Sequence, residues 1–187
     1  MKDRHMANIM FDLETFGTKP GSVLRSIGAV VFDPETGAMG QTFYRNIDRA
    51  SCEAVGLRVD PNTEAWWAKQ SREAQDALLV DCKPMAAVAT DFHQFFKACG
   101  GVQLWCQGAN FDSVLWEAAI NALWPSKSFL PWKFWNVRDT RTVYEIAGFD
   151  PNSLQRGGTY HNALDDSRFQ VRCVHAAVRL LRAEQYA

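Results

Sequence analysis

The sequence contains no apolar run that approaches the roughly 20 residues needed to cross a bilayer. Residues 1–6 likewise have no apolar stretch of the signal-peptide type. Membrane proteins and secreted precursors are therefore disfavoured, and we expect a cytoplasmic protein. We also expect residues 1–6 to be disordered or vector-derived, with Met6 as the natural start.

Cysteine pairs with the spacing of zinc or redox sites are also absent. The five cysteines are odd in number, lie far apart and include no Cys-x-x-Cys pair. A disulfide framework would use an even set, and a zinc site would use closely spaced pairs. The pattern therefore predicts reduced thiols in a reducing compartment: Cys52, Cys82, Cys99, Cys106 and Cys173.

Positive charge is not in excess. The chain has 20 lysines and arginines against 21 acidic residues, for a formal net charge of -1. Proteins that hold long duplexes by bulk electrostatics need many basic side chains facing phosphates. That class is disfavoured, whereas an enzyme that grips a short nucleic-acid end remains possible.

With 187 residues, 47% of them hydrophobic and 22% charged, the chain suits one globular domain over residues 1–187.

What the sequence does contain is a regular series of strand and helix signals. Residues 9–15, 24–33 and 41–47 predict an antiparallel meander, and residues 102–106 predict a fourth, buried strand. The polar segment 148–160 contains adjacent glycines and predicts a mobile loop. Helices are predicted over residues 65–70, 84–99, 112–123 and 140–147. A second helical stretch follows the first as far as about residue 79, and a long helix begins after residue 161 and ends at 184.

The first predicted strand ends in two carboxylates, Asp12 and Glu14, one residue apart. Side chains alternate along a strand, so both acids leave one face while Phe11 and Leu13 point into the core. Two like charges held this close repel each other unless a divalent cation lies between them. A pair of solvated acids at a strand end has the same short pattern, so further ligands are needed to decide.

Other acids stand at two later positions that suit a site. Asp112 lies at a predicted strand-to-helix corner, where it is either an N-cap or helix-dipole partner, or a ligand. His161 and Asp166 are five positions apart, which on a continuous helix separates them by about 140°. Both can face one site only if His161 lies in the loop before the helix. Asp166 is then fixed on the first turns, and the histidine moves with the loop.

The chain resembles the DEDDh, or DnaQ-like, 3′-5′ exonucleases at three motifs in the family's order: Asp12-Leu13-Glu14, Asn110-Phe111-Asp112 and His161-Asn162-Ala163-Leu164-Asp165-Asp166. Residues 66–71 and 161–168 look most like the short phage-type members, which are exodeoxyribonuclease VIII-like, and their relatives in the RNase AS group. The likeness covers nearly the whole chain. It implies an α/β, ribonuclease H-like fold with a mixed five-stranded sheet flanked by helices.

The resemblance implies a 3′-5′ exonuclease that releases nucleoside 5′-monophosphates from the 3′ end of single-stranded DNA or RNA. His161 is the implied general base. The family's spacing selects Asp166 as a ligand rather than Asp165, which we interpret as a solvated acid favoured by the helix dipole. A homodimer is expected from the short family members. Two divalent ions, Mg²⁺ or Mn²⁺, are implied at an all-oxygen ligand set: Asp12, Glu14, Asp112 and Asp166.

Four residues are predicted to contact the substrate: Thr15, Phe16, Trp67 and Asn110. Phe16 follows Glu14 and is placed to touch the terminal nucleotide. Of the two adjacent tryptophans, we expect Trp66 to anchor the helix and Trp67 to face outward, where its ring can stack on a base. Core packing by both tryptophans is the alternative.

Two other functions fit parts of the pattern. A ribonuclease H-like endonuclease or strand-transferase shares the carboxylate cluster but does not explain His161. A non-catalytic nucleic-acid-binding module with the same fold is expected to have lost at least one of the five groups. All five are present in the sequence, so the exonuclease is the favoured interpretation.

Overall fold

The central element is a mixed sheet of five strands in the order β3-β2-β1-β4-β5. β1 (Asn8–Thr15) pairs antiparallel with β2 (Leu24–Phe32), and β2 pairs antiparallel with β3 (Met39–Asn46). β4 (Gln103–Cys106) is parallel to β1, and β5 (Val137–Asp139) is parallel to β4. The predicted meander and the mixed five-stranded sheet are confirmed.

The computed structural model describes residues 8–108, 110–125 and 129–185. The segment 1–6, predicted to be disordered, lies outside the described residues. Within the described part of the chain, no helix is both long and apolar enough to cross a membrane.

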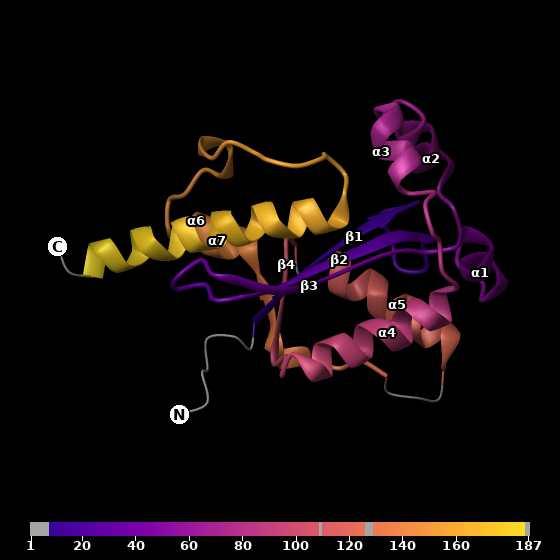
Figure 1. The fold of residues 1–187 in the computed structure, drawn as a ribbon, viewed down its shortest axis with the longest axis horizontal. Coiled ribbons are helices and arrows are strands. Elements are labelled where there is room, and N and C mark those ends of the chain that lie inside the picture. The colour runs from indigo at the N-terminus through magenta and orange to yellow at the C-terminus, as the bar shows by residue number, and fades with distance from the viewer. Residues whose placement is uncertain (1–7, 109, 126–128, 186–187) are drawn as a thin grey trace.

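Helices cover both faces of the sheet (Figure 1). One face carries α4 (Met85–Ala98) and α5 (Asp112–Leu123), and the other carries α6 (Thr140–Ile146) and α7 (Ala163–Gln185). Three short helices lie at one end of the sheet: α1 (Arg49–Ala54), α2 (Pro61–Trp67) and α3 (Arg72–Ala77). The 3-10 turn η2 (Phe134–Asn136) precedes β5, and the 3-10 turn η3 (Pro151–Ser153) precedes α7.

The predicted helices agree with the observed ones within a few residues at each end, but α1 was not predicted. This helix has six residues, and Cys52 is its buried member. It therefore has no apolar repeat that could identify it. Its start is fixed locally, because the Asp48 carboxylate accepts the backbone N–H of Ser51 at 2.8 Å.

Alternation along β1 divides the core between the two faces of the sheet. Phe11 packs against Phe92 of α4 and Trp116 of α5, with ring centroids 5.2 Å and 5.8 Å away. Met10 belongs instead to the cluster that contains Val171 of α7. Asp12 and Glu14 follow Met10 at two-residue intervals, so they lie on the α7 face. Their predicted orientation, opposite to Phe11 and Leu13, is confirmed.

Gly28 lets the first turn of α7 lie directly on the sheet. It is paired with Asp12 across β1 and β2. A Cβ atom added to Gly28 would lie 2.2 Å from the carbonyl carbon of Ala163 and 2.3 Å from the backbone nitrogen of Leu164. The Ser167 hydroxyl donates to the Gly28 carbonyl at 3.2 Å. The start of α7 is thereby held above the strand pair that carries Asp12.

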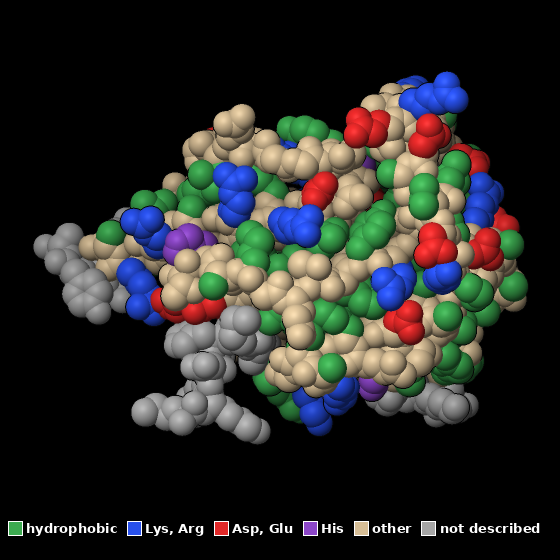
Figure 2. Space-filling model, viewed as in Figure 1, with side chains coloured by type: hydrophobic (Ala, Val, Ile, Leu, Met, Phe, Trp, Pro, Cys, Tyr) green, Lys and Arg blue, Asp and Glu red, His purple; other side chains and the backbone are tan. Residues whose placement is uncertain are grey.

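Charges of both signs are interspersed on the face shown in Figure 2. Basic and acidic side chains stand near one another over the sheet and the short helices, and the visible described surface has no broad basic field. This agrees with the net charge of -1. Bulk attraction to phosphates is therefore weak on this face.

Candidate active site

Two of the predicted acids come from β1. Asp12 and Glu14 project from one face of the strand, and Glu14 is 8% exposed. Gln170 of α7 donates its side-chain amide to Asp12 Oδ1 at 2.7 Å. The sequence analysis missed Gln170, although its spacing of four residues from Asp166 places both on one face of a helix.

Asp112 brings a third carboxylate to β1 from the other side of the sheet. It is the first residue of α5, whereas the cap position is Phe111, which makes no side-chain capping bond. Asp112 Oδ1 instead accepts the backbone N–H of Leu13, between the two β1 acids, at 3.2 Å. The capping alternative is therefore wrong, and the acid is directed to the strand.

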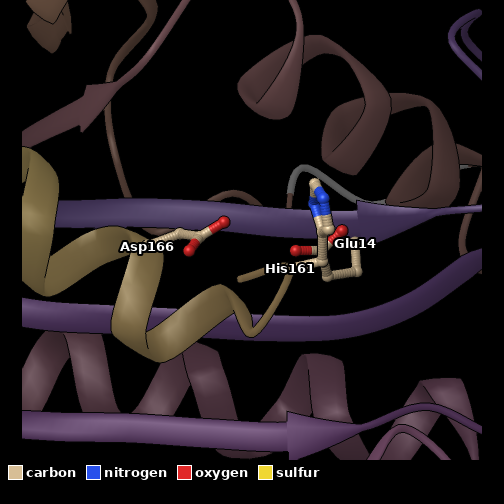
Figure 3. A group of neighbouring side chains, drawn as sticks. All are labelled: Glu14, His161 and Asp166. Carbon is tan, nitrogen blue, oxygen red and sulfur yellow. The ribbon is translucent and has the colours of Figure 1, made fainter. Parts of the chain in front are cut away.

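Asp166 and His161 reach the same place from the start of α7. Asn162 caps this helix, because its Oδ1 accepts the backbone N–H groups of Leu164 at 3.1 Å and Asp165 at 3.2 Å. His161 precedes the cap, so its predicted position in the loop before the helix is confirmed. Figure 3 shows Asp166 on α7 and His161 beside Glu14, and one ligand atom from each of the three lies within 4.8 Å of the others.

All five residues of the predicted catalytic set line one cleft of about 430 Å³ at the C-terminal ends of β1 and β4. Asn110, predicted to contact substrate, is an exposed turn residue at its edge. Five lining residues were not predicted as site residues: Leu13, Thr18, Gln107, Phe111 and Arg141. The full lining is Asp12, Leu13, Glu14, Thr18, Gln107, Asn110, Phe111, Asp112, Arg141, His161 and Asp166.

Electrostatics in the cleft favour a bound cation. Burial raises the pKa of Asp12 to about 7, from an ordinary value of 3.8. Burial also raises the pKa of Glu14 and of Asp112, and the neighbouring charge of Asp12 raises both further. Converging carboxylates that are difficult to ionise together provide oxygen ligands, which hard divalent cations prefer. The residues present therefore fit divalent metal ions.

Arg156 provides positive charge at this site. Its guanidinium forms an ion pair with Asp166 and lies over the rings of Tyr160, at 4.4 Å, and Phe169, at 5.1 Å. Burial, followed by the charge of Arg156, lowers the pKa of His161, which leaves the imidazole neutral near pH 7. Arg156 lies in an irregular segment without helical or strand periodicity, so no pattern in the sequence indicates its role.

Asp165 is not the solvated acid that we expected. Its side chain is 25% exposed and pairs with Arg168 at 3.1 Å. Its Oδ2 also accepts the backbone N–H of Thr159 at 3.0 Å. Gly158 has a φ of 82°, and an added Cβ there would lie 2.6 Å from the Asp165 carboxyl carbon. Asp165 therefore fastens the loop before His161, and Asp166 faces the other acids.

A second cavity, of about 520 Å³, adjoins the cleft and is more apolar. The two cavities share Leu13, Glu14, Thr18 and Phe111. Predicted residue Thr15 lines the second cavity, and its hydroxyl donates to the Gly17 carbonyl at 2.6 Å. The full lining is Leu13, Glu14, Thr15, Thr18, Asp60, Asn62, Thr63, Trp66, Trp67 and Phe111.

The predicted orientation of the adjacent tryptophans is wrong. Trp67 is 3% exposed, and its indole N–H donates to the Thr15 carbonyl at 2.8 Å. Arg25 lies over the Trp67 ring, 4.3 Å from the centroid. Trp66 is the outward residue, at 42% exposed. The helix α2 is only seven residues long, and the tertiary bond to Thr15, rather than its own polar pattern, decides which side is buried.

Phe16 also differs from its prediction. Its ring packs against the core, with the Arg25 guanidinium 4.4 Å and the Arg49 guanidinium 5.2 Å from its centroid. It lines neither the cleft nor the adjoining cavity. Its backbone is held by Val23 and Asp60, through bonds of 2.8 Å and 2.7 Å, which turn the loop away from the site.

Trp67→Ala is expected to destabilise the protein rather than only to weaken substrate binding. Removal of a buried aromatic side chain costs about 3–5 kcal/mol of unfolding free energy. The loss also leaves the Thr15 carbonyl without its partner. Urea denaturation measures the change, with Trp135→Ala as the matched control because Trp135 is 59% exposed. Equal unfolding free energies for the two variants would contradict the assigned role of Trp67.

Comparison with known sequences agrees with this geometry. A family model for the 3′-5′ exoribonuclease Rv2179c-like domain matches residues 7–178. An exodeoxyribonuclease of Enterobacteria phage T4 is 24% identical over 163 residues, which span 75% of this chain and 71% of the phage protein. The match to the family model extends over all three motifs of the site.

Solved structures share the fold. The nuclease domain of 3′hExo, a DEDDh family member bound to rAMP, has a TM-score of 0.56 and 15% identity, covering 96% of this chain and 94% of that chain. An E. coli ExoI-ssDNA complex has a TM-score of 0.59 and 17% identity, covering 95% of this chain and 40% of that chain. The predicted ribonuclease H-like fold class is confirmed. Because the family model covers most of its length, the chain belongs to the Rv2179c-like family of 3′-5′ exoribonuclease domains and is a 3′-5′ exonuclease, a phosphodiester hydrolase.

Proposed function

We propose that this exonuclease binds the 3′ end of a single-stranded nucleic acid and releases nucleoside 5′-monophosphates one at a time. The observation that carries the proposal is the convergence of four acids and His161 on one cleft. The fold alone serves many functions, whereas this complete set supports phosphodiester hydrolysis. Two divalent ions, Mg²⁺ or Mn²⁺, would be held by Asp12, Glu14, Asp112 and Asp166.

The side chains of the cleft have different roles in the reaction. Divalent ions bound there would stabilise the negative charge that develops on the phosphate. His161 is neutral near pH 7 and takes a proton from the attacking water. The water oxygen bonds to phosphorus as the bond to the 3′ oxygen breaks, so the released nucleotide keeps its 5′ phosphate. Asp165 and Asn162 hold the segment that carries His161.

The adjoining apolar cavity suits the terminal base. The net charge of -1 gives little general attraction to phosphates, so another interaction must hold the strand end. Stacking on an aromatic face contributes about 1–3 kcal/mol per base without sequence preference. Trp66 and Phe111 line this cavity next to Glu14 and supply such faces. Thr15 and Asn110 remain proposed contacts at its rim and at the cleft.

The sugar preference is left to experiment, since the family that matches is one of exoribonuclease domains, whereas the phage relative is an exodeoxyribonuclease. Matched DNA and RNA strands, labelled at the 5′ end, are expected to shorten stepwise from the 3′ end with Mg²⁺ or Mn²⁺. Chelation of the metal is expected to stop the reaction completely. Chromatography of the products should give nucleoside 5′-monophosphates.

Circular single strands provide the control, because they have no 3′ end. They are expected to survive under conditions that degrade the matched linear strands. Circles that are cut as fast as linear strands would favour the ribonuclease H-like endonuclease instead. Binding of strands without any cleavage, in either metal, would favour the non-catalytic module.

A further inference from the structure

Three aromatic rings meet beside the catalytic cleft. The His161 ring lies 4.9 Å from the Trp66 ring and 5.7 Å from the Trp67 ring, with interplanar angles of 82° and 79°. The two tryptophans are themselves 5.1 Å apart and edge to face. Such T-shaped contacts are a favoured geometry for aromatic pairs. The imidazole of the general base is therefore packed on both indoles.

Few other contacts set the direction of the imidazole. No described residue hydrogen-bonds its ring nitrogens, and His161 has a φ of 61°, in the left-handed region that non-glycine residues seldom adopt. Asp165 fastens the chain two residues earlier, at Thr159, but does not hold the ring. Apart from the ring of the neighbouring Tyr160, 6.3 Å away, the orientation of the imidazole toward Glu14 and Asp166 thus depends on the indoles.

The two indoles differ in how firmly they are held. Trp67 is buried, bonded to the Thr15 carbonyl and covered by Arg25. Trp66 is 42% exposed and lines the cavity that suits the terminal base. A half-exposed side chain retains rotamer freedom that a buried one has lost. Trp66 is therefore the member of the pair whose position can respond to an occupant of the cavity.

We propose that Trp66 is a positioning residue that couples occupancy of the base cavity to the placement of His161, an inference that rests on the proposed function. A base stacked on the exposed indole limits its rotamers. The edge of the indole then holds the imidazole toward the acids. With the cavity empty, the half-exposed indole keeps more rotamer freedom, so the imidazole that it contacts is held less firmly. Recognition of the terminal base thereby governs the rate of hydrolysis as well as binding.

The kinetic test compares linear strands that end in an ordinary nucleotide with strands whose 3′-terminal nucleotide lacks its base. At saturating strand, the wild type is expected to lose about tenfold to a hundredfold in kcat on the abasic end, because a misplacement of about 1 Å can cost 10²-fold. Trp66→Ala should have a low kcat on both ends, with no further loss on the abasic one. Trp66→Phe, which keeps an aromatic edge, should recover most of the rate.

A matched control and a second measurement separate positioning from general damage. Trp135→Ala removes an exposed tryptophan outside the cleft and should behave as the wild type on both strands. The proton resonances of the His161 ring, assigned with His161→Gln, report packing against the indoles in free protein without any turnover. They are expected to lose the part of their ring-current shift that comes from Trp66 in Trp66→Ala, and to change in the wild type when adenosine 5′-monophosphate is added.

Three results would overturn the proposal: a Trp66→Ala variant that changes only KM, one that keeps the penalty on the abasic end, or one whose His161 resonances match the wild type. If the wild type degrades no strand at all, the proposed function fails. The His161 resonances then decide by themselves whether Trp66 places the ring.

Discussion

Asp12→Asn is expected to abolish strand degradation while making the metal-free protein more stable. Burial raises the pKa of Asp12 to about 7, so its charge costs free energy in the folded state unless a cation is near. Asparagine keeps an acceptor oxygen for Gln170 but carries no charge for a metal ion. We expect the variant to lose about 4 kcal/mol of transition-state stabilisation, which lowers the rate of strand degradation roughly 10³-fold.

The gain in stability should depend on pH. The folded pKa of Asp12, about 7, exceeds the ordinary value of 3.8, so the wild type loses stability as pH rises between these values. The whole shift corresponds to at most about 4 kcal/mol. Urea denaturation in chelator should therefore give equal unfolding free energies for the wild type and Asp12→Asn at or below about pH 4, and a higher value for the variant at pH 8.

Asp165→Asn is the matched control, because it makes the same chemical change at an acid that faces the loop rather than the cleft. It should keep most of the activity. Addition of Mn²⁺ should raise the unfolding free energy of the wild type and of Asp165→Asn by mass action, and should leave Asp12→Asn unchanged. Full activity in Asp12→Asn, or a stability response to Mn²⁺ equal to that of the wild type, would show that Asp12 is not a ligand.

Gly28→Ala is expected to disable the enzyme although Gly28 contributes no side chain to the cleft. The added methyl group would lie 2.2 Å from the Ala163 carbonyl carbon, and helix backbone cannot turn aside as a flexible side chain can. The first turn of α7 must move off β2, and Asp166 and His161 move with it. Displacement of about 1 Å costs on the order of 10²-fold in rate, and overpacking costs about 1–3 kcal/mol of stability.

Gly157→Ala provides the comparison for Gly28→Ala. Nothing lies within 4 Å of a Cβ at Gly157, so this variant should unfold with nearly wild-type free energy. Steady-state assays and urea denaturation on the same preparations measure both effects. A Gly28→Ala protein that is as stable and as active as the wild type would show that close contact between β2 and α7 is not needed to place Asp166.

The parts of the site that the sequence predicted follow from periodicity. Asp12 and Glu14 share a face because side chains alternate along a strand, and their neighbours Phe11 and Leu13 lie in the opposite core. The loop position of His161 follows from the angular spacing of helix residues. These inferences depend only on local backbone geometry, which tertiary packing did not alter.

The parts that were missed or wrong depend on contacts between distant residues. Trp66 and Trp67 are adjacent and chemically alike, and the bond from Trp67 to Thr15 decides which one is buried. Arg156 lies in an irregular segment, and its ion pair with Asp166 forms only after that segment folds back on α7. Such choices are made by tertiary structure, so pattern and spacing in one sequence do not determine them.

The bond between Gln170 and Asp12 joins residues 158 positions apart, and the bond between Asp112 and Leu13 joins residues 99 positions apart. Contacts at such separations are slow to form, because the entropy of closing a long loop must be overcome first. Among the described residues α7 is the last helix along the chain, so the acids of β1 are synthesised long before the α7 residues that contact them. A ribosome-bound chain that ends before α7 lacks both Asp166 and Gln170, so the cleft is without its fourth acid and Asp12 without its amide partner until α7 has been made.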